Sequence, residues 1–362
     1  FDKEQVNQRV HDSLMASEQE VIRTLSKARK TIHDLPVLLS PAAEKHIETM
    51  AAQASELTRT RFGNTMQLFI PLYLSNECYN SCTYCGFSLE HNYERHTLSP
   101  EEIDKELSHI TSKGFQHLLL LTGESPKKVD ATYIAAAVKQ AKEKVASVGI
   151  EVQPLAEAEY QQVLEAGADS LTLYQESYHY DTYKKVHLFG LKRRYHNRLD
   201  AVERAAKCGM YKINLGVLLG LYDWRYDCLA LAQHVDYMQK KYWQSKYAVS
   251  FPRIKGMIGN FKSDYDVSDK HFLQIMLAFR LVFQDIGITL STREPAELRD
   301  GLMPLGITQL SAESNTSPGG YSQCDSQEQF EISDHRSLTD ICNSLKKSKL
   351  EPVFKDWDPA IA

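Results

Sequence analysis

The chain has 362 residues, of which 43% are hydrophobic and 25% are charged, and its formal net charge is -5 at pH 7. No apolar stretch approaches the length of a membrane-spanning helix, and no basic block is present that could follow a phosphate backbone. Membrane proteins and nucleic-acid-binding proteins are therefore excluded. We expect no targeting peptide, and seven cysteines without a paired framework predict a reducing compartment, the cytoplasm.

The first part of the chain is expected to be a helical lead-in without a core of its own. Ser17 and Glu20 have the spacing of a capping box, in which each residue satisfies the other's backbone N–H. Ser40 and Pro41 open a second helical segment, which Gly63 ends. An N-terminal helical extension is therefore predicted before the first strand.

From Gln67 onward, short apolar or β-branched runs alternate with helical stretches. In the second unit, Ser99, Pro100 and Glu102 supply a cap, a first-turn proline and a capping-box glutamate before a helix that ends near Gly114. The alternation predicts a parallel sheet with right-handed crossovers, and eight units are the number that closes a (β/α)8 barrel. The eight runs are QLFIPLYLS, HLLLLT, IEVQPL, DSLTLYQ, INLGVLLG, YAVSFPR, ITLSTR and ITQLSAE.

The predicted elements divide the chain into three parts. Residues 1–62 form the helical extension, residues 63–315 form the barrel, and residues 316–362 form a C-terminal loop and helix that close the barrel. The glycine-rich stretch SPGGYSQ after the eighth strand is expected to be a loop, which either covers the site or connects to the last helix.

Three thiols, those of Cys78, Cys82 and Cys85, directly follow the first strand in the sequence CYNSCTYC. Three thiolates in so short a loop can hold three irons of a cubane iron-sulfur cluster and leave the fourth iron open for another ligand. The alternative is a Cys3His zinc site that uses His91 or His96. The remaining cysteines are scattered singly and are expected to be small buried hydrophobes: Cys208, Cys228, Cys324 and Cys342.

Almost every predicted strand ends in residues that carry chemistry, and the carboxyl ends of the strands are where such a barrel has its active site. A redox cluster that converges with acids and arginines predicts a site for a small, charged, zwitterionic ligand. The strand ends concerned are Thr122-Gly123-Glu124, Tyr174-Gln175-Glu176, Pro252-Arg253, Ser291-Thr292-Arg293 and residues 311–314.

The cysteine loop, with the aromatic Tyr84 before its last cysteine, resembles that of the radical S-adenosylmethionine (SAM) superfamily. LLLLTGE resembles the superfamily's glycine-glutamate motif, YHNRLDAVERAAKCGM the segment whose arginine meets the methionine carboxylate, and NLGVLLGLYDW the glycine motif beside adenine. The resemblance implies two cofactors, a 4Fe-4S cluster with one open iron and SAM. It implies cofactor contacts from Tyr84, Thr122, Gly123, Glu124, Glu176, Arg198, Gly216 and Gly220.

Within the superfamily, the chain is similar to the 2-iminoacetate synthases, the tyrosine lyases of thiamine thiazole biosynthesis. The similar strings are FIPLYLSNECYNSCTYCGFS, EVQPLAEAEY, LYQESYH, YWQSKYAVSFPR, LSTREP and EPVFKDWD. The resemblance implies that a 5'-deoxyadenosyl radical starts the cleavage of the Cα–Cβ bond of L-tyrosine to 2-iminoacetate and p-cresol. It also implies two protein partners, a thiazole synthase and a one-electron donor such as flavodoxin or ferredoxin.

An α-amino acid substrate requires an anion clamp. Ser291 and Arg293 offer a hydroxyl and a guanidinium fork, and the family places its substrate carboxylate at this strand end. The structural alternative for Arg293 is an exposed ion pair with Glu294 or Glu297.

The proposed cofactor contacts have structural alternatives as well. Glu176 could be a rim acid paired with Arg198, and Tyr84 could be ordinary core packing. The glycines of the motifs could simply permit tight turns.

Other functions stay open at this stage. Hydrogenase maturases also cleave tyrosine but use a second cysteine cluster, whereas the tail here has only Cys324 and Cys342, with no close pair. The other candidates are a radical SAM enzyme that acts on another amino acid and a non-catalytic iron-sulfur or zinc module that serves as an assembly partner.

Overall fold

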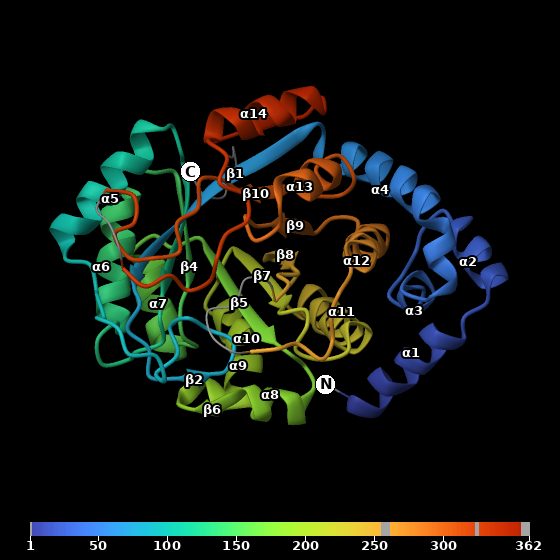
Figure 1. Ribbon diagram of the computed structural model, residues 1–362, viewed down its shortest axis with the longest axis horizontal. Coiled ribbons are helices and arrows are strands. Elements are labelled where there is room, and N and C mark those ends of the chain that lie inside the picture. The colour runs from blue at the N-terminus through green and yellow to red at the C-terminus, as the bar shows by residue number, and fades with distance from the viewer. Residues whose placement is uncertain (1, 255–260, 323–325, 356–362) are drawn as a thin grey trace.

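The computed structural model describes residues 2–254, 261–322 and 326–355. Eight parallel strands form a closed barrel surrounded by helices (Figure 1). The closing pair is β1 (Thr65–Ser75) with β10 (Gln309–Ser311), in which Gln67 lies opposite Gln309. The predicted (β/α)8 barrel is therefore confirmed.

All eight predicted runs overlap a barrel strand. The third run is displaced, because β4 begins opposite β3 at Ser147 and ends at Glu151, so that residues 152–155 lie beyond the strand. This shift places Glu151, and not Leu155, at the carboxyl end of β4. The other strands of the barrel are β3 (His117–Thr122), β4 (Ser147–Glu151), β5 (Ser170–Glu176), β7 (Lys212–Val217), β8 (Lys246–Ser250) and β9 (Gly287–Leu290).

The helices on the outside of the barrel follow the strands in chain order. The box predicted at Ser99 and Glu102 is present, and Glu102 N donates to Ser99 Oγ at 3.3 Å. The barrel helices are α5 (Pro100–Ser112), α6 (Ala131–Lys142), α7 (Glu157–Glu165), α8 (Tyr180–Val186), α9 (Tyr195–Leu199), α10 (Ala201–Lys207), α11 (Trp224–Lys241), α12 (Asp269–Val282) and α13 (Ala296–Leu302), with the 3-10 turn η2 (Leu191–Arg193).

The N-terminal helices pack along one side of the barrel (Figure 1). The capping box of Ser17 and Glu20 is formed, and Gly63 ends the last of these helices with φ 68°. Val6 and Val21 belong to the same apolar core as the barrel strands, so the extension shares the barrel's core. Its helices are α1 (Lys3–Met15), α2 (Glu18–Leu25), α3 (Leu35–Leu38), η1 (Ala42–His46) and α4 (Ile47–Phe62). The division at residues 62 and 315 stays a prediction.

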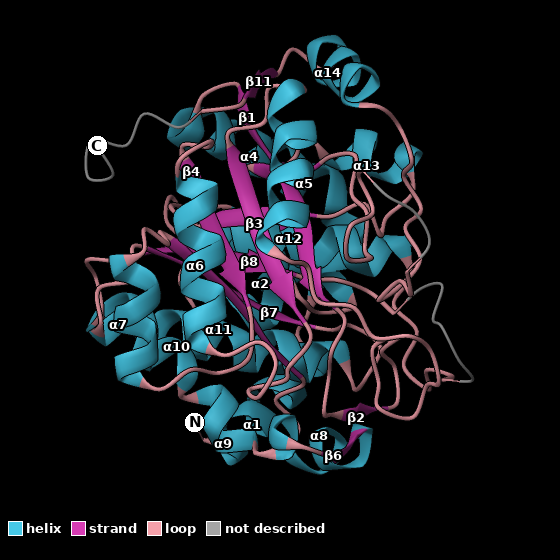
Figure 2. Ribbon diagram, turned by 90° about the vertical axis from the view of Figure 1, so that its left-hand side faces the viewer, coloured by secondary structure: helices cyan, strands magenta, loops and turns pink. Residues whose placement is uncertain are grey.

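Three short strands of the described chain lie outside the barrel. β2 (Ser81–Cys82), inside the cysteine loop, pairs antiparallel with β6 (His187–Phe189). β11 (Glu351–Val353), after the last helix α14 (Leu338–Lys347), pairs parallel with the beginning of β1. Figure 2 shows β2 and β6 at the end of the molecule where the long loops gather. None of the helices in the described part of the chain is long and apolar enough to cross a bilayer.

The segment after β10 is fixed across the carboxyl end of the barrel by a buried ion pair. Arg299 in α13 and Asp334 are both fully buried and hydrogen bonded to each other. Arg336 also donates to Asp334, from Nε at 2.9 Å and from a terminal nitrogen at 2.8 Å. Asp334 N donates to Thr292 O at 3.1 Å, which ties the segment to the end of β9.

We predict that Asp334→Ala destabilises the protein by about 3–5 kcal/mol, because Arg299 would remain as a buried, unpaired charge. Urea denaturation measures the loss. Asp104→Ala is the matched control, since it removes the exposed pair with Lys144 and should cost at most about 1 kcal/mol. Equal effects of the two variants would contradict the anchoring role of Asp334.

Candidate functional site

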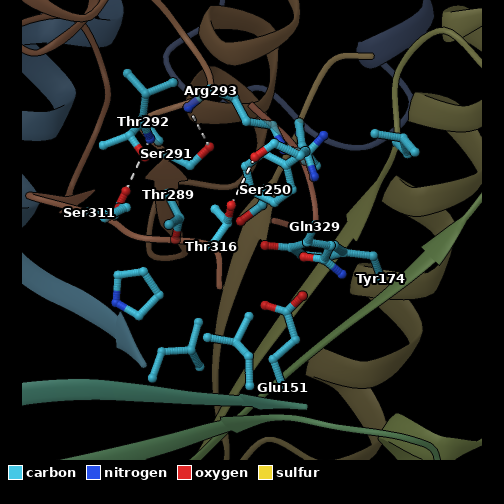
Figure 3. Close-up of a pocket in the computed structure, with 18 of the residues that line it drawn as sticks. Glu151, Tyr174, Ser250, Thr289, Ser291, Thr292, Arg293, Ser311, Thr316 and Gln329 are labelled. Atoms are coloured by element: carbon cyan, nitrogen blue, oxygen red, sulfur yellow. Dashed lines mark hydrogen bonds between the residues drawn. The ribbon is translucent and has the colours of Figure 1, made fainter. Parts of the chain in front are cut away.

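A cavity opens at the carboxyl ends of the barrel strands and, with its open mouth, holds about 1090 Å³ of space not filled by atoms. Its concave position at the strand ends suits a small-molecule ligand. Its walls combine aromatic rings with a few charged and hydroxyl side chains, and Figure 3 shows many of them. The charged and sulfur-containing residues that line it are Cys85, Glu151, Glu176, Lys192, Arg293 and Glu294.

The cysteine loop begins directly where β1 ends. Cys82 is buried and Cys78 and Cys85 are half-buried, and all three thiols are free. Burial raises the pKa of each thiol, to about 11 for Cys78, and the neighbouring thiols contribute to the rise at Cys78 and Cys82. Three neighbouring thiols whose pKa values are all raised by burial fit the ligand set of an iron cluster, since iron stabilises thiolates that the protein alone does not.

The zinc alternative finds no support in the loop's geometry. Within residues 2–254, 261–322 and 326–355, no three His, Cys, Asp or Glu side chains lie close enough to hold a single metal ion. His96 Nε2 lies 3.1 Å from a carboxylate oxygen of Glu102. The ligands of a cubane bind three different irons and need not converge on one point, so the three thiols remain compatible with a cluster.

A buried charge network joins the cysteine loop to two strand ends. Arg198 in α9 donates from Nη1 to Glu124 at 2.7 Å, from Nη2 to Glu176 at 3.5 Å and from Nε to Tyr174 O at 2.6 Å. Lys192 Nζ donates to Glu176 at 2.7 Å. Asn80, between the first two cysteines, donates from Nδ2 to Glu124 at 2.9 Å. Three predicted cofactor residues, Glu124, Glu176 and Arg198, are thus brought together.

Two members of this network, Asn80 and Lys192, were missed in the sequence. The Lys192 backbone N–H donates to Asn80 Oδ1 at 2.9 Å, so the two residues bind each other as well as the acids. Burial alone would lower the pKa of Lys192, as would Arg198, but Glu176 holds it above its ordinary value. Lys192 lies in a run of basic residues that is typical of a solvated surface, so its place in the buried network could not be predicted from the sequence.

Glu176 is paired with Arg198, as expected if it is a rim acid, and also with Lys192. Its backbone has φ 70°, and the register between β5 and β7 shifts between Tyr174 and Glu176. A non-glycine residue in the left-handed region is strained, and such strain concentrates at functional sites. The role of Glu176 toward SAM stays a prediction.

Gly123 is needed for the close approach of the cysteine loop to the end of β3. A Cβ at this position would lie 2.2 Å from Glu77 O and 3.2 Å from Cys78 Cβ. Gly123 N donates to Ser75 O at 2.8 Å. The Thr122 hydroxyl beside it is buried and has no hydrogen-bond partner in the described chain. A buried, unpaired hydroxyl next to the cysteine loop fits a site completed by a ligand.

The remaining predicted cofactor residues lie near the same end of the barrel. Gly216 leaves room for Tyr174, whose Cδ1 would lie 2.5 Å from a Cβ at this position. Gly220 has φ 107°, which favours glycine. Tyr84 lines the cavity, and its hydroxyl donates to His187 Nε2 at 2.7 Å, because His187 Nδ1 must carry the hydrogen that bonds Tyr183 O at 2.8 Å.

Ser291 and Arg293 both line the cavity beyond the end of β9 (Figure 3). The guanidinium of Arg293 stacks at 3.4 Å on the ring of Phe330 and forms no ion pair with any described residue. The predicted structural alternative is wrong, because Glu294 is bonded instead to Arg253, whose Nε lies 2.9 Å from it. Burial lowers the pKa of Arg293. A half-buried cation with no anionic partner among the described residues is a ready site for a carboxylate.

Arg253 does not act as a free strand-end cation. Its guanidinium bonds Glu294, lies 2.7 Å from Asp269 and donates to Val267 O at 2.9 Å. It also stacks over Phe272. The strand end Pro252-Arg253 therefore serves the structure.

Glu151 is a site residue that the sequence did not reveal. It lines the cavity at the end of β4, and its carboxylate makes no hydrogen bond or ion pair with any described residue. Burial raises its pKa to about 7, with a further contribution from Glu176. In the order of the eight strands, β4 and β9 are separated by three strands on either side, so Glu151 and Arg293 face each other across the barrel. Figure 3 shows the Glu151 carboxylate directed into the cavity.

The segment after the glycine-rich stretch covers part of this cavity. Gln329 receives a hydrogen bond from the Tyr73 hydroxyl at 2.8 Å, and Gly86 N, in the cysteine loop, donates to Gln329 O at 3.0 Å. The stretch itself is anchored outside the barrel, where Ser322 N donates to Glu106 at 2.8 Å. The residues of this segment that line the cavity, Gln329 and Phe330, therefore come after SPGGYSQ.

Three of the isolated cysteines, Cys208, Cys228 and Cys342, do not line the cavity. Cys228 is buried in α11, as expected, whereas Cys208 and Cys342 are only half-buried. Cys208 Sγ lies 3.4 Å from Glu157 O. Cys324 lies outside the described residues.

We predict that Gly123→Ala lowers the iron and acid-labile sulfide retained after anaerobic reconstitution by at least about half, because the new methyl group would overlap Glu77 and displace the cysteine loop. Metal and sulfide analysis measures the loss, with Cys78→Ser as the reference for a broken ligand set. Gly301→Ala, at a position in α13 where a Cβ meets nothing within 4 Å, should leave both values unchanged. Full retention in Gly123→Ala would contradict the close fit.

Comparison with known proteins agrees with this geometry. Residues 72–231 match the Radical SAM superfamily, and residues 250–351 match the Biotin and Thiamin Synthesis associated domain. The chain is 42% identical over 341 residues to the 2-iminoacetate synthase of Escherichia coli (strain K12), covering 94% of this chain and 90% of that protein. It is 29% identical over 254 residues to a 3-methylornithine synthase of Methanosarcina acetivorans, covering 69% of each chain.

Among solved structures, HydG, a maturase of the [FeFe]-hydrogenase, superimposes with a TM-score of 0.93 at 29% identity, covering 97% of this chain and 80% of that one. The likeness extends over the barrel and the N-terminal helices. The resemblance inferred from the cysteine loop is therefore confirmed. The chain belongs to the radical SAM superfamily and, within it, to the family of the 2-iminoacetate synthases.

Proposed function

We propose that this protein is a radical SAM lyase that cleaves the Cα–Cβ bond of L-tyrosine to 2-iminoacetate and p-cresol, as a step toward the thiazole of thiamine. The identity of 42% over nearly the whole chain supports this activity. The observation that carries the substrate assignment is the cavity with a guanidinium on one side and a carboxylate on the other, neither of them paired with any residue that the structure describes.

As a member of the superfamily, the enzyme uses a 4Fe-4S cluster and SAM. When bound, these cofactors supply the one-electron chemistry that makes a carbon radical. The ligands proposed for the cluster are Cys78, Cys82 and Cys85. The contacts proposed for SAM are Tyr84, Thr122, Gly123, Glu124, Glu176, Arg198, Gly216 and Gly220.

The network of Glu124, Arg198 and Glu176 suits the methionine part of SAM, which carries one amino group and one carboxylate. Both acids and the arginine are at least partly satisfied within the protein, so ligand binding would exchange existing bonds for new ones. The Thr122 hydroxyl has no partner within the described part of the chain and can bind a ligand without losing a bond.

The substrate is proposed to lie across the barrel. Arg293 receives the tyrosine carboxylate through its planar fork, and Ser291 adds a hydroxyl. From there the side chain extends toward Glu151 on the opposite strand, which can accept a hydrogen bond from the phenol. The rings of Tyr73 and Tyr174, which also line the cavity, flank this path and exclude water from it.

A tyrosine lyase of the hydrogenase-maturation type is the second candidate, supported by the high structural similarity to HydG. The identity to that protein is 29%, against 42% to the 2-iminoacetate synthase, and this difference favours the thiamine branch.

The proposed protein partners are a thiazole synthase, which would consume the unstable imine, and a one-electron donor such as flavodoxin or ferredoxin. An oxygen-sensitive cluster and free thiols fit a reducing compartment, and we propose the cytoplasm.

We predict that the reconstituted enzyme, given SAM, a strong reductant and tyrosine without oxygen, forms 5'-deoxyadenosine, p-cresol and glyoxylate, the hydrolysis product of 2-iminoacetate. Arg293→Lys should weaken tyrosine binding by about 10- to 100-fold, because lysine keeps the charge but loses the fork. Tyrosine-independent SAM cleavage should persist in this variant. Carbon monoxide or cyanide in amounts matching p-cresol would move the protein to the maturation branch, and 5'-deoxyadenosine without p-cresol would contradict the lyase assignment.

We also predict that Glu151 selects tyrosine over phenylalanine. In Glu151→Leu the affinity for tyrosine should fall by about 10- to 100-fold while that for phenylalanine changes little, because only tyrosine loses a charge-assisted hydrogen bond. The pKa of Glu151 is about 7, so the carboxylate that accepts the phenol is present above this pH and is lost below it.

Tyrosine binding by the unmodified enzyme should therefore strengthen as the pH rises from 6 to 8, and Glu151→Gln should remove this dependence. Equilibrium binding of both amino acids at each pH tests the two statements. Unchanged discrimination in Glu151→Leu would place the phenol elsewhere.

A further inference from the structure

An exposed apolar patch lies beside the cysteine loop. Leu188 and Phe189 in β6 have relative exposures of 51% and 61%, which is unusual for large apolar side chains. Other exposed apolar residues lie on the neighbouring backbone. We call this set the hairpin patch, and its members are Tyr79, Leu89, Leu188, Phe189 and Leu191.

The hairpin patch is fixed directly to the segment that holds the cysteines. β6 pairs with β2 so that Phe189 lies opposite Ser81 and His187 opposite Cys82. Leu89 N donates to Asn80 O at 2.9 Å. Cys82, a proposed cluster ligand, is only 5% exposed and lies in β2, directly beside the strand β6 that carries Leu188 and Phe189. Figure 2 shows β2 and β6 close together beside α8, at the edge of the molecule.

The charge around the patch differs from that of the whole chain. Four basic residues of α8 and η2 and its C-cap border it, and none forms an ion pair with a described residue. We call them the basic rim: Lys184, Lys185, Arg193 and Arg194. Two acids lie beside the patch, Asp181 in α8 and Glu90, which accepts a hydrogen bond from Ser81 Oγ of β2 at 2.7 Å. The four basic residues outnumber them. A locally basic surface on a chain with a net charge of -5 is suited to an acidic partner.

From this combination we infer that the hairpin patch and basic rim form the docking surface for a small acidic electron-carrier protein that reduces the cluster. The inference rests on the proposed function, which requires a reduced cluster. In the step concerned, one electron leaves the reduced carrier and enters the cluster, so the carrier is oxidised by one electron and the cluster is reduced by one, and no bond is made or broken.

The surface has the features of a transient electron-transfer interface. Such interfaces are small, with an apolar centre and charged borders that steer association. A second copy of the chain is disfavoured as the occupant, because a symmetric contact through the patch would bring two basic rims together. The thiazole synthase is the other possible occupant, and the experiment separates it from the carrier.

The test uses flavodoxin as the probe and two double variants of the reconstituted enzyme. Leu188→Ser with Phe189→Ser removes the apolar centre, and Arg193→Glu with Arg194→Glu reverses half of the rim. Each should raise the Kd for oxidised flavodoxin by about tenfold or more, and the charge variant should lose most of the salt dependence of binding. p-Cresol formation driven by reduced flavodoxin should fall by a similar factor. Turnover driven by dithionite should change by less than about twofold, because this small reductant needs no docking surface.

Matched controls alter equally exposed side chains elsewhere. Trp243→Ser replaces an apolar side chain that is 74% exposed, and Lys105→Glu with Lys139→Glu reverses two exposed charges on α5 and α6. Neither should change the Kd for flavodoxin.

Unchanged flavodoxin binding in both patch variants would overturn the inference, and so would an equal loss of the dithionite-driven rate, which would mean that the hairpin maintains the active site itself. Retained flavodoxin binding with lost binding of the thiazole synthase would assign the surface to that partner instead. Absence of p-cresol from the unmodified enzyme with dithionite would refute the proposed function, whereas the flavodoxin Kd measurement tests the docking surface separately.

Discussion

The buried network of Asn80, Glu124, Arg198, Glu176 and Lys192 is the constraint on which the site depends. Two acids balance two bases there, and each is held by hydrogen bonds, which is the condition under which charges can be buried. The network spans the cysteine loop, the ends of β3 and β5, and the turn and helix after β6. Removing one charge would leave its partners unpaired in a dry environment, so these segments keep a fixed relative position.

The same network lies between the hairpin patch, where the electron carrier is proposed to dock, and the cavity. Lys192 bonds Asn80 with its backbone and Glu176 with its side chain, and it follows directly after the hairpin patch. The cavity carries two charges of opposite sign, Arg293 and Glu151, which come from opposite strands of the barrel and pair with no described residue. A substrate with a carboxylate at one end and a hydrogen-bond donor at the other satisfies both. Tyrosine has this form, and phenylalanine lacks the donor.

Much of the fold could be predicted because its signals are local. The capping boxes at Ser17 and Ser99 and the apolar run before Cys78 each lie within a few residues. The barrel strands were placed by their runs, but periodicity fixes a strand's existence better than its end. For this reason Glu151 was not recognised as a site residue. The predicted run extended to Leu155, so Glu151 was placed in the interior of the third strand and not at its end. The register with β3 shows instead that β4 ends there.

Other site residues could not be predicted because their roles depend on contacts between distant segments. Arg253 ends its strand as a candidate ligand does, but Glu294, 41 residues away, occupies it. Because Glu294 pairs with Arg253, it does not pair with the adjacent Arg293. In the sequence, Lys192 resembles the basic surface residues that follow it. In the structure, it is bonded to Asn80 of the cysteine loop and to Glu176.

On the proposed function, the cysteine loop and the charges of Arg293 and Glu151 hold the cofactors and tyrosine in one barrel. The most direct measurement is an anaerobic crystal structure of the reconstituted enzyme with SAM and L-tyrosine. We expect three irons on Cys78, Cys82 and Cys85, the tyrosine carboxylate on Arg293 and the phenol oxygen within hydrogen-bond distance of Glu151. A fourth protein ligand on the cluster, or a tyrosine bound with its carboxylate away from Arg293, would contradict the account.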